Sequence, residues 1–139
     1  MNRLGNMVTL LVLAGLTAAG PAFGKTFTSD KAEFRLDMVA EGLEHPWSLA
    51  FLPDGSQLVT EREGRLRRIK NGELQDKPIA GVPELVVSGQ GGLLDVILHP
   101  NFENNRTLFL SYAHKISREG LTTRVAHATL DGDRDRKST

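Results

Sequence analysis

Short apolar segments separated by turn residues run through the chain from Phe34 onward. No stretch of a dozen residues in this region repeats its apolar positions every 3.6 residues, as an amphipathic helix would. The separators combine Pro, Asp, Asn and Gly, residues that favour tight turns, as in Pro53-Asp54-Gly55 and Asn71-Gly72. The pattern therefore predicts an all-β chain. Seven strands are expected, over residues 34–39, 47–51, 57–61, 65–69, 93–98, 108–113 and 124–130.

Two of these segments can be laid over each other. Residues 47–54 and 94–101 lie 47 positions apart, and in each an apolar strand ends in Pro followed by Asp or Asn, with a second alternating strand after the turn. A period in the forties, built of four short strands, is typical of a β-propeller blade. The alternative is a chance likeness between two hairpins of a β-sandwich.

The length limits how many blades the chain can form. Residues 25–139 hold about two and a half such repeats, whereas closed propellers have about four to eight blades. An unclosed array would leave sheet faces and strand edges exposed. Residues 134–139 are wholly polar, where another blade should begin with an apolar strand. We therefore expect the first two to three blades of a longer propeller.

The first residues have the features of a secretory signal peptide. Arg3 precedes an apolar stretch over residues 7–19, and Gly20 and Pro21 then break it before small residues. We expect a signal peptide over residues 1–24, cleaved after Gly24, and a propeller domain over residues 25–139. The apolar stretch is short for a membrane span, with an uncleaved anchor as the alternative, and no stable span is expected after cleavage. The predicted location is the bacterial periplasm or exterior.

Charge and cysteine content exclude several kinds of function. The chain has 17 basic and 17 acidic residues and no basic cluster beyond positions 65, 67 and 68 and the short tail, so nucleic-acid binding is not expected. It contains no cysteine, which excludes disulfides, thiolate nucleophiles and Cys-ligated zinc. Any bound metal must have oxygen or imidazole ligands.

Three motifs carry a resemblance to a known family. They are His45-Pro-Trp-Ser-Leu-Ala-Phe-Leu-Pro-Asp-Gly55, Thr60-Glu-Arg62 with Gly64-Arg-Leu66, and Gly89-Gln-Gly-Gly-Leu-Leu-Asp-Val96 with His99-Pro100. In this order, from about residue 43 to 133, the chain resembles the soluble PQQ-dependent sugar dehydrogenases, that is, the glucose/sorbosone or aldose sugar dehydrogenase family. The resemblance implies a six-bladed β-propeller, a periplasmic location, pyrroloquinoline quinone (PQQ) and calcium.

The resemblance also implies a reaction and its partners. An aldose would be oxidised to a lactone by hydride transfer to the PQQ quinone, and an electron acceptor would then reoxidise the cofactor. Gln90 is the one site residue that can be carried over, as a substrate- or cofactor-binding amide flanked by glycines. The catalytic histidine, the cofactor-clamping basic residues and the calcium ligands are expected beyond Thr139. No catalytic or metal-binding residue is therefore assigned within the chain, and the fragment alone should be inactive.

Other polar and aromatic residues are better explained by structure than by catalysis. Turn capping or packing is expected for the histidines that precede prolines, and no catalytic role for the remaining two. Asp95 could face the propeller channel or make hydrogen bonds within its blade. Glu61 and Arg62 are expected as an exposed or bridging pair, and Trp47 as blade core. The histidines in question are His45 and His99, each before a proline, and His114 and His127.

Two functions of other classes stay open on the sequence alone. One is a non-catalytic extracellular propeller that binds a glycan or a protein, because a fold does not determine a function. The other is a calcium-dependent propeller hydrolase of the lactonase type. The sugar oxidised, the electron acceptor and the oligomeric state are not determined by the sequence.

Overall fold

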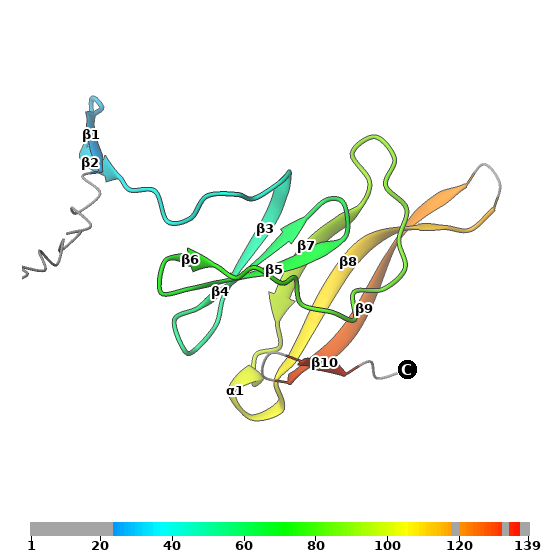
Figure 1. Cartoon of the computed structure of the whole chain (residues 1–139). Coiled ribbons are helices and arrows are strands. Elements are labelled where there is room, and N and C mark those ends of the chain that lie inside the picture. Colours follow the sequence, from blue (N-terminus) through cyan, green and yellow to red (C-terminus); the bar gives the residue numbers. More distant parts are fainter. Residues whose placement is uncertain (1–23, 118–119, 132–133, 137–139) are drawn as a thin grey trace, which may run out of the picture. The chain divides into compact units, whose positions relative to one another are not determined.

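The computed structural model describes residues 24–117, 120–131 and 134–136. The predicted signal peptide, residues 1–24, lies outside this part except for Gly24. The chain divides into two units, residues 1–37 and 38–139. In the first, β1 (Lys25–Thr28) and β2 (Glu33–Leu36) form an antiparallel hairpin, drawn in blue in Figure 1. Phe27 and Phe34 stack across the two strands with ring centroids 5.7 Å apart.

The second unit begins with a four-stranded antiparallel sheet, here called sheet 1 (Figure 1). Its strands follow one another in space as in sequence. The Asn71-Gly72 turn between the last two has positive φ at both residues, 54° and 79°, as the tightest hairpins require. The strands are β3 (Pro46–Phe51), β4 (Gln57–Glu61), β5 (Arg65–Lys70) and β6 (Glu73–Leu74).

A second four-stranded antiparallel sheet, sheet 2, follows with the same strand order. It contains a single helical turn, α1 (Phe102–Asn105), between its first two strands, where only a turn was expected. Residues 134–136, in the polar segment where no strand was predicted, pair with the preceding strand as the fourth strand of this sheet. The strands are β7 (Leu93–Leu98), β8 (Thr107–Lys115), β9 (Leu121–Asp131) and β10 (Arg134–Arg136).

The register of the strands confirms the repeat that the sequence predicts. Both sheets have an irregularity in the first strand, between Pro46 and Ser48 in sheet 1 and between Leu93 and Val96 in sheet 2. An equivalent hydrogen bond accompanies each irregularity. The N–H of Ser48 donates to the Thr60 hydroxyl at 3.1 Å, and the N–H of Asp95 donates to the Ser111 hydroxyl at 3.0 Å. The two sheets are therefore two propeller blades with equivalent positions.

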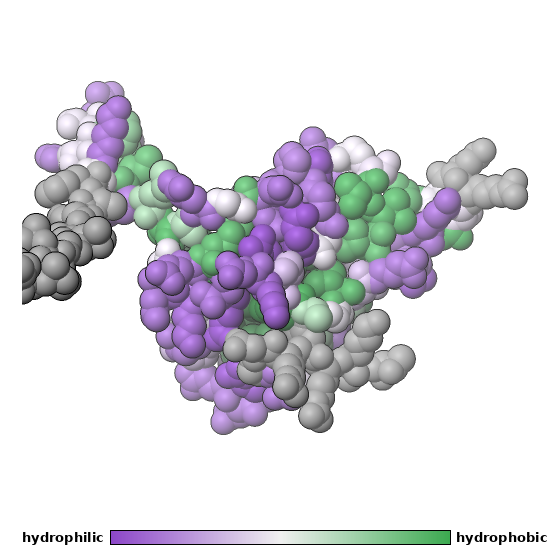
Figure 2. Space-filling model, viewed as in Figure 1, coloured by the Kyte–Doolittle hydropathy of each residue, from purple (hydrophilic) through white to green (hydrophobic). Residues whose placement is uncertain are grey.

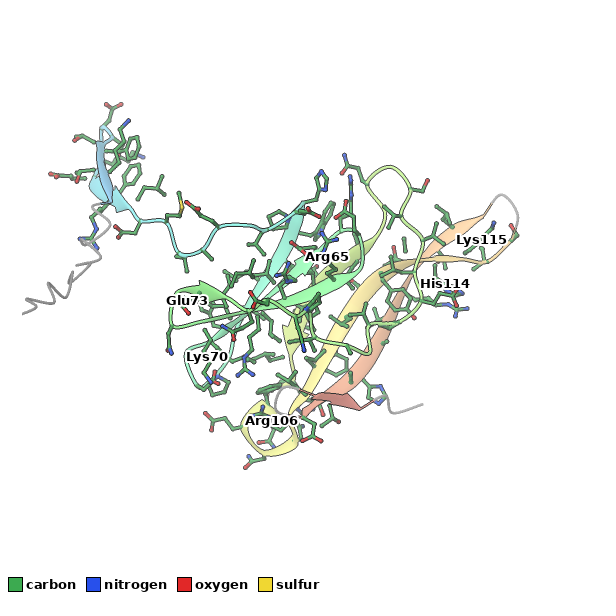
Figure 3. The ribbon with its side chains drawn as sticks, in the orientation of Figure 1. Arg65, Lys70, Glu73, Arg106, His114 and Lys115 are labelled. Atoms are coloured by element: carbon green, nitrogen blue, oxygen red, sulfur yellow. The ribbon has the colours of Figure 1, made fainter. Side chains whose placement is uncertain are left out.

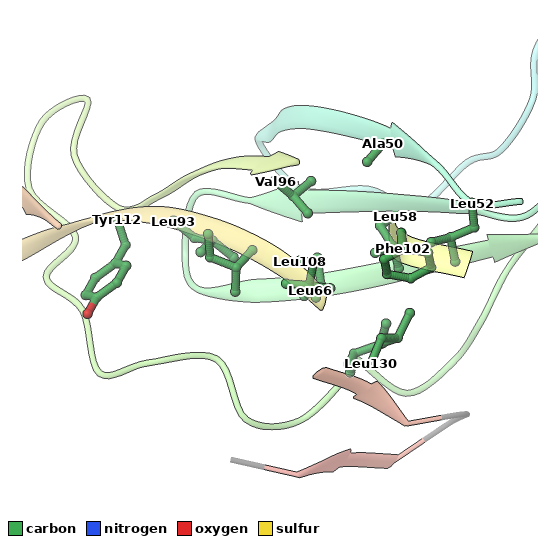
Figure 4. Packing of buried hydrophobic residues seen from close by; sticks show 12 residues of the cluster. Ala50, Leu52, Leu58, Leu66, Leu93, Val96, Phe102, Leu108, Tyr112 and Leu130 are labelled. Carbon is green, nitrogen blue, oxygen red and sulfur yellow. The ribbon is translucent and has the colours of Figure 1, made fainter. Parts of the chain in front are cut away.

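The hydrophobic core lies between the two sheets (Figure 4). Both blades contribute side chains to it, because strands with alternating apolar residues present one apolar face each. Burying each leucine contributes about 1.5–3 kcal/mol, so the interface between the blades is the main source of stability of this unit. The side chains with almost no exposed surface include Leu58 from sheet 1 and Leu93, Val96, Leu108 and Leu130 from sheet 2.

Polar contacts also join the two blades. The Thr60 hydroxyl donates to the Leu94 carbonyl at 2.6 Å, and the N–H of Val96 donates to the Ser48 hydroxyl at 3.4 Å. Both contacts reach the backbone of β7, whose free edge has no strand partner in sheet 2. They fix β7 against sheet 1 by directional bonds that the apolar core alone does not supply.

Trp47 departs from the prediction that it belongs to the blade core. Its surface is 47% exposed, and it lies on β3 beside Leu49 and Phe51, which are exposed to 51% and 67%. The reason is that the core forms only where one sheet covers another.

Among the residues that the structure describes, no helix is both long and apolar enough to cross a membrane.

Candidate functional site

Gln90 lies at the tip of a tight loop between the two sheets. Ser88 and Gly91 close the loop with reciprocal backbone hydrogen bonds of 3.1 and 2.8 Å. Gly89 has a φ of +57°, and a Cβ at this position would meet no atom within 4 Å. Gln90 itself is exposed. The loop therefore presents one amide side chain and an unobstructed backbone to the outside.

Arg62, at the turn between β4 and β5, holds this loop. Its guanidinium Nη1 donates to the Gly89 carbonyl at 3.2 Å, and its own carbonyl accepts from the N–H of Leu93 at 2.9 Å. Gly92 passes so close that a Cβ there would lie 2.1 Å from the Arg62 carbonyl oxygen. The glycine at position 92 is thus required by the close approach of two backbones. The hydrogen bond between Arg62 and Gly89 could not be predicted from the sequence, because the two residues lie 27 positions apart.

Glu63 extends the same network. Its Oε1 accepts from Arg62 Nη2 at 3.1 Å and lies 2.7 Å from the Nδ1 of His45. Burial alone would raise the pKa of the Glu63 carboxyl, but its own backbone N–H, Arg62 and His45 together hold that pKa below its usual value. His45 therefore serves the turn: its side chain contacts Glu63, and its carbonyl accepts from the N–H of Arg62 at 3.1 Å.

Glu61 and Arg62 do not form the exposed or bridging pair that was expected. The Glu61 side chain is completely buried, and it accepts hydrogen bonds from the backbone N–H of Glu44 at 2.6 Å, Arg65 Nε at 2.5 Å and Arg67 Nη1 at 3.4 Å. Burial raises the pKa of Glu61, but these donors outweigh it and the net shift is downward. The sequence did not reveal this, because the three donors come from outside β4, from the segment before β3 and from β5.

Arg65, labelled in Figure 3, completes this ion-pair group. Its Nη2 contacts Glu44 at 2.5 Å, and the bond from its Nε to Glu61 is the main reason that its pKa is raised. Arg62 and Arg67 are likewise paired with carboxylates of this chain. These three arginines are thus occupied by internal partners.

The remaining histidines have structural surroundings. His99 Nδ1 accepts from the N–H of Asn101 at 2.9 Å and contacts the Asn105 amide, which confirms the expected turn-capping role. His114, labelled in Figure 3, is half-buried and lies edge-on to Tyr112 with centroids 6.3 Å apart. His127 and Asp95 are exposed on the face of sheet 2 that points away from sheet 1.

A groove of about 350 Å³ lies against sheet 1. Its walls are almost entirely apolar and hold no titratable side chain, so it offers no group for acid–base chemistry. Hydrophilic residues instead gather over the β5–β6 side of sheet 1 in the view of Figure 2. The groove is lined by Val39, Ala40, Leu43, Pro46, Trp47, Ser48, Leu49, Phe51, Gln57, Val59 and Ile69.

The fit of the implied calcium and PQQ can be tested on the described residues. Within the described part of the chain, no three His, Cys, Asp or Glu side chains come together as a possible metal site. The described residues therefore do not form a calcium site. The Gln90 loop can contact one edge of a sugar or a flat quinone, but one amide cannot hold a tricarboxylate such as PQQ, which needs cations.

Comparisons with known proteins agree on one family. A family model described as "Glucose / Sorbosone dehydrogenase" matches residues 43–139. The chain is 36% identical over 128 residues to the aldose sugar dehydrogenase YliI of Escherichia coli (strain K12), covering 91% of this chain and 32% of that protein. It is 30% identical over 112 residues to quinoprotein glucose dehydrogenase B of Acinetobacter calcoaceticus, covering 78% of this chain and 23% of that protein.

A solved structure gives the same result for the fold. The PQQ-bound form of the aldose sugar dehydrogenase of Streptomyces coelicolor matches with a TM-score of 0.62 and 29% identity, over 84% of this chain and 31% of that one. The chain therefore spans about a third, or less, of the proteins it matches. The shared part includes both sheets and the Gln90 loop, because the family model covers residues 43–139.

Proposed function

Since the chain belongs to the glucose/sorbosone dehydrogenase family, we propose that it forms the first two blades of a PQQ-dependent dehydrogenase that oxidises aldose sugars to lactones. When bound, PQQ supplies the hydride acceptor. An electron acceptor then reoxidises the cofactor. The contribution of this chain is one wall of the binding site, built on the Gln90 loop.

The observation that carries the proposal is the clamped loop between the blades. Gln90 is exposed at the tip of this loop. Arg62, which belongs to the first blade, donates a hydrogen bond of 3.2 Å to the carbonyl of the neighbouring Gly89. A neutral amide can donate to one oxygen and accept from a hydroxyl, without a change of charge with pH. A loop held at fixed geometry loses little conformational entropy when it binds a sugar. Gln90 therefore suits the orientation of a polyhydroxylated substrate beside a flat cofactor.

The chemical step requires groups that the described residues do not supply. We propose that the histidine base, the cations that hold the PQQ carboxylates and the calcium ligands follow Thr139 in the longer protein. The internal pairing of Arg62, Arg65 and Arg67 with carboxylates supports this division. Residues 25–139 alone should then show no turnover with PQQ, calcium, glucose and an electron-accepting dye.

We also propose export to the bacterial periplasm or exterior, after removal of residues 1–24. The apolar segment at residues 7–19, preceded by Arg3 and followed by small residues, supports this location. N-terminal sequencing of the protein from a periplasmic extract tests it, and a mature chain that begins at Lys25 is the expected result. A chain that retains residues 1–24 would contradict the cleavage.

The activity is tested in a chimera in which residues 25–139 replace the matching segment of the E. coli aldose sugar dehydrogenase. We expect PQQ-dependent dye reduction with aldoses. Gln90→Ala should lower kcat/KM about tenfold, because one hydrogen bond of about 1.4 kcal/mol is lost. Gln75→Ala, on the edge of sheet 1, is the matched control and should have no effect.

Two results would contradict the proposal. Sugar-lactone hydrolysis that requires calcium but no PQQ would indicate a lactonase instead. A folded chimera with full activity after Gln90→Ala would remove Gln90 from the site. Arg62→Ala separates positioning from contact, because it should lower kcat/KM while hydrogen exchange at the Gly91 amide becomes faster, whereas Gln90→Ala should leave that exchange unchanged.

A further inference from the structure

The turn between β4 and β5 contacts the Gln90 loop at two places, one before and one after the glutamine. Before it, the Arg62 guanidinium binds the Gly89 carbonyl at 3.2 Å. After it, the N–H of Leu93 donates to the Arg62 carbonyl at 2.9 Å. The second contact joins two backbones and needs no particular side chain. The first depends on a long side chain with many rotamers, so it holds the loop only if that side chain is itself fixed.

Glu63 fixes the side chain of Arg62. Its Oε1 accepts from Arg62 Nη2 at 3.1 Å, while Nη1 of the same guanidinium reaches the loop. A guanidinium is planar and its N–H groups point in fixed directions, so a bond at Nη2 also sets the direction of Nη1. The side chains of Arg62 and Glu63 are only 25% and 28% exposed, so water competes less with this pair than with a pair on an open surface.

His45 is the second partner of the same carboxylate oxygen. Its Nδ1 lies 2.7 Å from Glu63 Oε1, and because a carboxylate only accepts hydrogen bonds, Nδ1 carries the hydrogen. The backbone of His45 is left-handed, with a φ of +44°, which costs free energy in a residue with a Cβ. Such strain persists only where surrounding contacts maintain it, and it is concentrated at functional sites.

The second blade shows that the backbone bond of His45 does not require this strain. The His45 carbonyl accepts from the N–H of Arg62 at 3.1 Å, and at the equivalent place in sheet 2 the Gly92 carbonyl accepts from the N–H of Ala113 at 2.8 Å. Gly92 does not have a positive φ, although a glycine could adopt one without strain. The left-handed backbone of His45 therefore goes with its side chain, which reaches Glu63, and not with its carbonyl.

We propose that Glu63 and His45 are positioning residues for Gln90. They act through the guanidinium of Arg62, which binds the carbonyl next to Gln90. The imidazole orients the carboxylate, and the carboxylate orients the guanidinium. Neither side chain contacts the sugar itself. This inference rests on the proposed role of Gln90 and extends it to two residues at the entry and the first turn of the other blade.

The hold on the loop is tested first, without any activity. Hydrogen exchange at the Gly91 amide reports opening of the loop, because this N–H closes it on the Ser88 carbonyl at 2.8 Å. In the 139-residue chain, Glu63→Ala should make this exchange about fivefold faster. Glu63→Gln keeps an acceptor oxygen for Arg62 and should restore most of the protection. The amides of β4, a central strand of sheet 1, are the reference and should not change.

His45→Gly separates positioning from stability. Glycine adopts the left-handed conformation without strain, and this gain offsets its greater freedom in the unfolded chain, so Tm should change by less than about 3 °C. The imidazole is lost, however, and exchange at Gly91 should become about threefold faster. Asn71→Gly is the matched control, because it also replaces a left-handed residue, at a φ of +54° in the turn between β5 and β6. It should leave the exchange at Gly91 unchanged.

The link to catalysis is tested in the chimera with the E. coli aldose sugar dehydrogenase. Glu63→Ala should lower kcat/KM for an aldose about threefold, through a higher KM. On top of Gln90→Ala, the same substitution should have no further effect, because Glu63 acts only through that amide. If Gln90→Ala alone has no effect, the proposed role of Gln90 fails, and with it this link to catalysis. Exchange at Gly91 then decides separately whether the two residues hold the loop.

Three results would overturn the inference. Unchanged exchange at Gly91 in both Glu63→Ala and His45→Gly would show that the two residues do not hold the loop. An equal acceleration at Gly91 and in β4 would show a loss of global stability and not of positioning. An additive loss of kcat/KM in the Glu63→Ala, Gln90→Ala double variant would show that Glu63 affects the reaction by another route.

Discussion

Sheet 1 and sheet 2 are built to one plan, yet equivalent positions of the two sheets differ in burial. Leu66 and Val125 occupy the same register position, and their exposures are 2% and 68%. The difference does not come from residue type, since both are apolar. It comes from the neighbouring sheet, which covers one position and leaves the other open. Burial in a repeat protein is thus a property of the interface between repeats.

The largest expected contrast lies in this pair. Leu66→Ala should lower the free energy of unfolding by about 2–5 kcal/mol, because it removes buried methyl groups and leaves a cavity. Val125→Ala is the matched control on the face of sheet 2 that points away from sheet 1, and it should change the free energy of unfolding by less than about 0.5 kcal/mol. Urea unfolding of both variants checks the comparison. Similar losses for the two variants would show that the face of sheet 2 around Val125 is covered in solution.

The next comparison is between Arg68 and His127, which occupy equivalent register positions on the two sheets. Arg68 Nε donates to the Ser56 hydroxyl at 3.1 Å, and its Nη2 contacts the Asp54 carboxylate at 2.8 Å. Arg68→Ala should cost about 1.5–3 kcal/mol, because charged hydrogen bonds in a buried setting are lost. His127→Ala should be nearly neutral, since this side chain is exposed. Chemical unfolding distinguishes the two, and a large loss for His127→Ala would break the comparison.

The entry to each sheet gives a third contrast. Gly92 precedes β7 and His45 precedes β3, but only Gly92 lies against a turn of another blade. Gly92→Ala should destabilise the chain by about 1–3 kcal/mol, because the new Cβ would force the Arg62 carbonyl away. His45→Ala should cost less than about 1 kcal/mol, as expected for an exposed ion pair. Thermal unfolding of both variants checks this, and equal Tm values would contradict the close approach.

The smallest effect concerns Glu61, whose register position in sheet 2 is taken by Tyr112. Because folding lowers the pKa of Glu61, its charge stabilises the fold above the ordinary glutamate pKa of about 4.3, and this contribution is lost as pH falls through the folded pKa. Glu61→Gln should therefore cost about 1 kcal/mol at pH 7, and the difference from the unsubstituted chain should shrink toward pH 3. Urea unfolding across this range checks it, with Glu103→Gln as control. A constant difference would argue against the charge.

The alternating apolar residues predicted most strands closely. The expected strands at 57–61 and 93–98 coincide with β4 and β7, and the repeat offset is found in the strand register. The strands β1, β6 and β10 were missed, because they are too short to show a clear alternation, and an edge strand needs only backbone pairing. The helical turn α1 was missed because its four residues are too few to show a helical period.

The candidate site was predictable only in part. Gln90 was assigned from the resemblance to the family motif, and a loop there follows from the conformational freedom of the glycines that flank it. The Arg62 contact to that loop and the burial of Glu61 could not be read from the sequence, because each depends on residues from other strands. The expected core position of Trp47 was wrong for the same reason: no sheet of the described residues covers its side of β3.

The sequence by itself determined the all-β character, the repeat and the family, because period-two alternation, turn residues and ordered motifs are local in the chain. The tertiary structure alone decided which of two equivalent faces is buried, which carboxylate is shielded and which guanidinium holds the Gln90 loop. These properties depend on what lies across a gap of a few ångströms, and that neighbour can be close by in space while it is far away along the chain.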